Sequence, residues 1–340
     1  MKNTLRITAF GILFVSVLAA LSALFNGPFW YTNGYVANRD ARYAAIDLEE
    51  PDQIDVLNVG NSLCGVSLTP LELYRDYGIT SYNIGRDLQS RPATYYAVKM
   101  ALRKQKIKVL LWETDNLCLR QDGITTYTQE LSEFNYYHFP VLRYHSFWKN
   151  WINGKKRGEF YKGYQIRKMT VSPDPDKKTS GKDVENDTQN AWNEEREQKR
   201  IKKLLTNIEL NKQITFDQEQ LRAFKRINNL CRANNIKLVL YSAPSMKYYR
   251  SRARHDALAK LAEQYGIDYV DANFDEMAIG IDWNKDSYDG GGHLNINGTR
   301  KMTKYMGEYL STHCGLTDHR GDPAYAAWAD MERYDRECEE

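Results

Sequence analysis

The chain has 340 residues, and its 47 lysines and arginines against 44 aspartates and glutamates give a net charge of +3. The length allows one large core with a sizeable insertion. The near balance of charges argues against a nucleic-acid partner. The five cysteines form no CxxC pair or Cys/His cluster of the kind that holds zinc. Neither a metal nor an organic cofactor is indicated.

The amino terminus carries a segment suited to a membrane. Residues 7–25 are uncharged and mostly apolar, and they are long enough to cross a hydrocarbon layer of about 30 Å. Lys2 and Arg6 precede them, which favours a signal anchor with its amino end in the cytoplasm. We expect a single-pass anchor at residues 1–26, a juxtamembrane stalk at 27–50, and an extracytoplasmic body. The sequence leaves open whether the anchor is cleaved.

Apolar runs alternate with helical patterns in residues 51–116 and 211–314. The predicted strands are residues 54–59, 79–84, 108–114, 236–241 and 268–271. The predicted helices are residues 70–77, 92–106, 216–234, 251–265 and 297–311. This order predicts an α/β fold, a three-layer α/β/α sandwich around a mainly parallel five-stranded sheet.

The alternation breaks between the two stretches. Residues 136–148 are rich in aromatics, whereas 172–203 are nearly devoid of them and cannot bury much apolar surface. We interpret 117–210 as a mostly helical or irregular insertion, partly flexible, that serves as a lid or a partner surface. Residues 315–340 are expected to form a C-terminal tail.

The first predicted strand ends at Gly60-Asn61-Ser62. Ligand sites of open α/β sheets lie beyond the carboxyl ends of strands, so Ser62 is a candidate nucleophile. The same tripeptide also suits a plain turn that caps the next helix. A serine needs a base, usually a histidine oriented by a carboxylate. His293 follows a Gly-rich loop, with Asp289 and Asp286 upstream.

Four blocks in this order resemble the SGNH (GDSL-like) hydrolase superfamily. They are residues 60–62, 81–85, 112–116 and 289–298. The resemblance is greater to a membrane-anchored extracytoplasmic branch, which is similar to the teichoic-acid D-alanylation and alginate acetylation proteins. It implies the flavodoxin-like SGNH fold for residues 51–116 and 211–314.

The resemblance also implies roles for individual residues. Ser62 would attack an ester carbonyl, with His293 as general base and Asp289 as the acid behind it. The backbone N–H groups of Ser62 and Gly85, with the side chain of Asn116, would form the oxyanion hole. The implied activity is that of a serine esterase or O-acyltransferase acting on an acylated cell-envelope glycan or polymer.

Two points leave alternatives open. Asp289 lies four positions before His293 where the family pattern has three, so Asp286 is an alternative acid. Asp115 or Glu113 could face the pocket instead of Asn116.

Arg86, Gln89 and His145 are candidate substrate contacts. The displaced acid and the long insertion also suit a second function. In that alternative the chain is a catalytically degenerate scaffold that partners a membrane-bound O-acyltransferase.

Overall fold

The computed structural model describes residues 2–25, 46, 49–85, 89–118, 215–245, 252–274, 279–287 and 291–330. The chain divides into two units, residues 1–48 with 121–163 and residues 49–120 with 164–340. Most of the predicted stalk and insertion, and residues 331–340, therefore lie outside the described part. Their predicted roles stay predictions.

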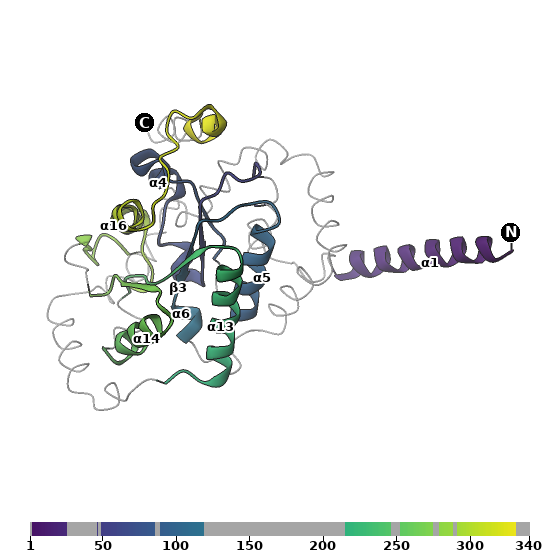
Figure 1. Ribbon diagram of the computed structural model, residues 1–340, viewed down its shortest axis with the longest axis horizontal. Coiled ribbons are helices and arrows are strands. Elements are labelled where there is room, and N and C mark those ends of the chain that lie inside the picture. Colours follow the sequence, from purple (N-terminus) through teal and green to yellow (C-terminus); the bar gives the residue numbers. More distant parts are fainter. Residues whose placement is uncertain are drawn as a thin grey trace, which may run out of the picture. The chain divides into compact units, whose positions relative to one another are not determined.

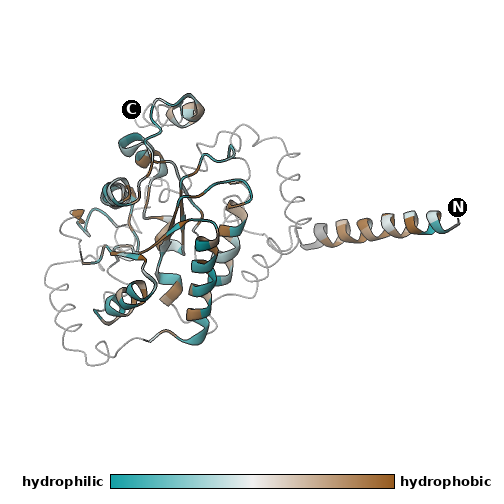
Figure 2. Cartoon of the chain, in the orientation of Figure 1, coloured by the Kyte–Doolittle hydropathy of each residue, from teal (hydrophilic) through white to brown (hydrophobic). Residues whose placement is uncertain are grey.

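The described part of the first unit is mainly helix α1 (Lys2–Phe25). Among the described residues, it is the helix long and apolar enough to cross a membrane, over Asn3–Leu21. That stretch is 0% buried, so its apolar side chains are not used for a core. Figure 2 shows its apolar character along most of its length.

The second unit contains a five-stranded sheet. Its strands are β1 (Val56–Val59), β2 (Ser81–Asn83), β3 (Val109–Glu113), β4 (Lys237–Ser242) and β5 (Asp268–Asp271). They lie in the order β2-β1-β3-β4-β5, and every neighbouring pair is parallel. This is the flavodoxin-like strand order. The predicted α/β fold with a five-stranded parallel sheet is confirmed.

Helices cover both faces of this sheet (Figure 1). They are α4 (Pro70–Tyr77), α5 (Arg91–Ala101), α13 (Gln218–Ala233), α14 (Arg252–Tyr265) and α16 (Ile296–His313). Helices α4 and α16 pack together on one face, and α5 and α13 pack together on the other.

Alternate strand residues fill the two layers of the core, because successive side chains of a strand point to opposite faces. Leu111 and Val239 belong to the cluster that includes Met302 and Met306 of α16. Trp112, the next residue of β3, instead stacks on Phe224 of α13 with ring centroids 6.3 Å apart. All of these side chains are fully buried.

Two short helices at the carboxyl edge of the sheet were not among the predicted elements. Helix α3 (Ser62–Gly65) follows β1, and α6 (Asp115–Cys118) follows β3. Each begins within three residues of the end of its strand. Together they place Ser62, Asp115 and Asn116 at one edge of neighbouring strands.

The first residues of the predicted tail are packed onto the sheet unit. The 3-10 helix η1 (Pro323–Tyr325) leads to Trp328, which is fully buried beside Leu71 and Tyr74 of α4. His319 Nε2 lies 2.9 Å from Asp55 Oδ2, and both side chains are buried. Residues 315–330 therefore contribute to the core of this unit.

Candidate active site

The turn that carries Ser62 is tightly constrained. Gly60 has a φ of +154°, and a Cβ atom there would lie only 2.8 Å from the Cβ atoms of Cys64 and Glu113. Asn61 is the N-cap of α3, and its Oδ1 accepts a hydrogen bond from the N–H of Leu63 at 3.1 Å. Gly-Asn-Ser thus caps a helix and also presents the Ser62 hydroxyl at the edge of the sheet.

The described residues on either side of His293 hold it at the same edge. Residues 287 and 294 form an antiparallel bridge across the base of the loop. Asn295 then caps α16 by accepting from the N–H groups of Asn297 and Gly298. The His293 Nε2 atom lies 2.9 Å from Ser62 Oγ, a hydrogen-bond distance. The two side chains are 231 positions apart in the sequence.

Of the two candidate acids, Asp289 and Asp286, the structure describes the second. Asp289 lies outside the described residues. Asp286 is buried, and its Oδ2 accepts from Lys301 Nζ and from the N–H of Asp282, each at 2.6 Å. The carboxylate of Asp286 therefore ties the residues before the loop to α16.

Gly85 lies directly beside the turn that carries Ser62. A Cβ atom at this position would overlap the sulfur of Cys64 and would lie 3.2 Å from the carbonyl oxygen of Asn61. A residue without a side chain is thus needed for β2 to end against α3.

The side chain of Asn116 is engaged inside the protein. Its Nδ2 donates to Thr94 Oγ1 and its Oδ1 accepts from Trp112 Nε1, both at 2.7 Å. Gln89 is also buried and donates to the same Thr94 oxygen at 3.0 Å. The other candidate substrate contacts, Arg86 and His145, lie outside the described residues.

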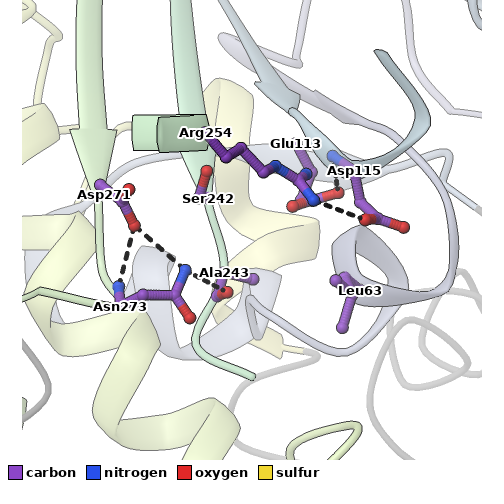
Figure 3. Close-up of a pocket in the computed structure, with 8 residues that line it drawn as sticks. All are labelled: Leu63, Glu113, Asp115, Ser242, Ala243, Arg254, Asp271 and Asn273. Carbon is purple, nitrogen blue, oxygen red and sulfur yellow. Dashed lines mark hydrogen bonds and ion pairs between the residues drawn. The ribbon is translucent and has the colours of Figure 1, made fainter. Parts of the chain in front are cut away.

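Glu113 and Asp115, the alternatives to Asn116, line a small polar cavity at the carboxyl ends of the strands (Figure 3). Its volume is about 10 Å³, the scale of one water molecule. Glu113 Oε2 accepts from the N–H of Asp115 at 2.9 Å. Burial first, and then the negative charge of Asp115, raise the pKa of Glu113 to about 8. Glu113 is therefore mainly protonated at neutral pH.

The cavity also contains Arg254, which was not among the predicted site residues. Figure 3 shows its side chain extending from α14 toward Glu113 and Asp115. Its Nη1 lies 3.2 Å from Asp115 Oδ1. Residues 254, 258 and 261 share the buried face of α14. An arginine on an otherwise apolar face is the signal from which the sequence could have identified it.

Comparisons with known proteins give little further information. No family model matches the chain, and no curated protein matches it. One solved structure, a Bacteroides fragilis protein provisionally described as an acylhydrolase, is 14% identical with a TM-score of 0.38. The match covers 79% of this chain and 94% of that one. A likeness this weak decides neither the family nor the chemistry, so both depend on the geometry above.

Proposed function

We propose that this protein is a membrane-anchored serine esterase or O-acyltransferase of the SGNH type. The observation that carries the proposal is the 2.9 Å contact between His293 Nε2 and Ser62 Oγ at the carboxyl edge of the parallel sheet. A nucleophile within hydrogen-bond distance of a base is the arrangement that covalent acyl transfer needs.

The chemistry proceeds in two halves. Ser62 Oγ attacks the ester carbonyl carbon while His293 Nε2 takes the hydroxyl proton, which gives a tetrahedral oxyanion. The oxyanion collapses, the bond to the alcohol breaks, and His293 returns the proton to the leaving oxygen. Water or an acceptor hydroxyl then attacks the acyl-serine by the same route and releases an acid or a new ester. In this proposal Asp289 orients His293.

The oxyanion would be bound by the backbone N–H groups of Ser62 and Gly85. The close approach of Gly85 to the nucleophile turn supports this pairing. Asn116 would contribute the second hydrogen of its amide, since Thr94 accepts the first.

The anchor supports an envelope substrate. Lys2 and Arg6 lie in the first turns of helix α1, on the amino side of its uncharged apolar stretch, which favours a cytoplasmic amino end and an extracytoplasmic body. An acylated glycan or other envelope polymer is the ester-bearing substrate expected at that location. A membrane-bound acyltransferase would be the natural donor or partner.

Labelling with a fluorophosphonate tests the proposal on the full-length protein in detergent micelles. The wild-type chain should be labelled at Ser62 and should hydrolyse p-nitrophenyl acetate. Ser62→Ala should lose the label and should hydrolyse the ester at least about 10³-fold more slowly, because the nucleophile is gone.

Ser311→Ala is the matched control, because Ser311 is an exposed serine of α16 whose hydroxyl donates to the carbonyl of Glu308, one turn earlier on the same helix. It should be labelled like the wild type. A folded wild-type chain that is neither labelled nor active would instead support the scaffold alternative.

A further inference from the structure

The turn that carries Ser62 contacts Glu113 and Asp115, two acidic residues at and just after the end of β3. The backbone of Gly60 packs against Glu113, close enough that a Cβ atom at Gly60 would lie 2.8 Å from the Glu113 Cβ. The side-chain amide of Asn61 donates to Asp115 Oδ2. The two residues before Ser62 are thus held by the two carboxylate residues.

Arg254 supplies the countercharge from α14. Its guanidinium meets Asp115 Oδ1 at 3.2 Å, and the two side chains are only 7% and 6% exposed. At so low an exposure, removing the guanidinium leaves the charge of Asp115 with little solvent and without its arginine, which is strongly unfavourable.

In this cluster the positive charge of Arg254 is matched by the negative charge of Asp115. Glu113 is mainly protonated at neutral pH, because its pKa is raised to about 8. Asp271, the other carboxylate of the cavity, accepts hydrogen bonds from Tyr269 and Asn273 and pairs with His255. Figure 3 shows it across the cavity from Asp115. The ion pair that Arg254 makes in this cluster is with Asp115.

This balance matters for the proposed reaction, and the inference rests on that proposed function. The tetrahedral intermediate develops negative charge beside Ser62, and a nearby unpaired carboxylate would oppose it strongly in a medium of low dielectric constant. We propose that Arg254 is a positioning residue for Ser62. It holds Asp115, which holds Asn61 and the nucleophile turn, and it neutralises the carboxylate next to that turn.

Three variants of the full-length protein in detergent test this: Arg254→Met, Asp115→Asn and the double variant. Each is assayed at neutral pH for its rate of fluorophosphonate labelling and for kcat and KM with p-nitrophenyl acetate. Arg254→Met should slow labelling and lower kcat by about tenfold or more, with KM changed by less than about twofold, because it acts on the reacting turn and not on substrate contacts.

The double variant should recover to within about threefold of the wild type. An asparagine at position 115 still accepts the hydrogen bond from Asn61, and no buried charge is left unpaired. A general loss of packing at Arg254 would not be rescued by this second change. Asp115→Asn alone should also stay within about threefold, because Glu113 can then ionise and pair with Arg254.

Arg252→Met is the matched control. Arg252 lies two residues earlier on the same helix, is largely exposed, and pairs with Asp256 at 2.9 Å. Its removal should leave labelling unchanged. Thermal unfolding of each variant establishes which ones are folded during the assay.

The outcomes separate the two proposals. A wild-type chain that is not labelled overturns the proposed function and this inference with it. A labelled wild type with a folded Arg254→Met variant that reacts at the wild-type rate overturns the inference alone. Should Arg254→Met fail to fold, a folded double variant that reacts about tenfold more slowly than the wild type overturns it equally.

Discussion

At the scale of single residues, Glu113 and Asp115 line the same small cavity as the guanidinium of Arg254, which pairs with Asp115. Burial dominates for Glu113, the charge of Asp115 adds to it, and the opposing effect of Arg254 is smaller, so the pKa of Glu113 rises to about 8. The folded protein therefore holds a proton that the unfolded chain releases from about pH 4.5 upward. Folding becomes less favourable as the pH rises from there to about 8.

The variant Glu113→Gln should weaken this pH dependence, because glutamine has the shape of the protonated acid and cannot ionise. We expect the wild type to lose more free energy of unfolding than the variant between about pH 6 and about pH 8.5. Chemical denaturation of both full-length proteins in the same detergent, followed by circular dichroism, measures the difference. Equal losses would show that Glu113 does not titrate in this range.

Single residues also mark how far the candidate site can be predicted from sequence. Ser62 was predicted because it follows a strand with clear boundaries, and His293 because it precedes a helix with clear boundaries. The sequence could not decide between Asp115 and Asn116, because neighbours on a helix point about 100° apart and nothing local sets the phase of so short a helix. Arg254 was not predicted because its partner, Asp115, lies 139 positions away in the sequence.

At the scale of elements, length and end signals separate what was predicted from what was missed. Helix α4 begins at Pro70 and ends at Tyr77, and Gly78 directly after it has the left-handed φ of +67° expected there. The four residues of α3 or α6 show no helical periodicity, and their formation depends on the strands that precede them. Long elements with clear end signals could thus be predicted from the sequence, whereas the short helices α3 and α6 at the site could not.

The first turn of helix α13 is attached to α6 by hydrogen bonds whose contribution to stability can be tested. Its first turn is a capping box, in which Asp217 and Gln220 exchange hydrogen bonds of 2.8 Å. The Gln220 amide also donates to the carbonyls of Leu117 and Cys118 at the end of α6. Gln220→Ala should therefore lower the free energy of unfolding more than Asp217→Ala, which should cost about 1 kcal/mol.

Denaturation of the two variants compares them directly, with Gln218→Ala as the control because that side chain is exposed on the same turn. A smaller effect for Gln220→Ala than for Asp217→Ala would mean that the bonds to α6 add no stability.

At the scale of the whole sheet unit, the last described residues help to hold the core. Trp328 is fully buried against Leu71 and Tyr74, with its ring centroid 5.7 Å from that of Tyr74. No periodic pattern in the sequence predicts this contact, because a single tryptophan in a polar segment does not indicate where it packs. The parallel sheet, by contrast, followed from the alternation of apolar strands and amphipathic helices.

Trp328→Ala should lower the free energy of unfolding by about 3–5 kcal/mol, the usual effect of removing a buried aromatic side chain. The control Ala327→Ser changes an exposed neighbour and should have little effect. Denaturation of the full-length proteins measures both. A loss below about 1 kcal/mol for Trp328→Ala would show that residues 315–330 do not stabilise the fold.

The contact between Ser62 and His293 has a consequence for biosynthesis. The serine is among the first residues of the sheet unit to be made, and the histidine follows 231 positions later. Every strand is synthesised before His293, and the loop that holds it is tied to α16 by Asp286 and Asn295. A nascent chain therefore contains Ser62, the proposed nucleophile, for most of its synthesis but gains His293, the proposed base, only near the end. Premature termination before His293 would yield a chain that lacks the base of the proposed reaction.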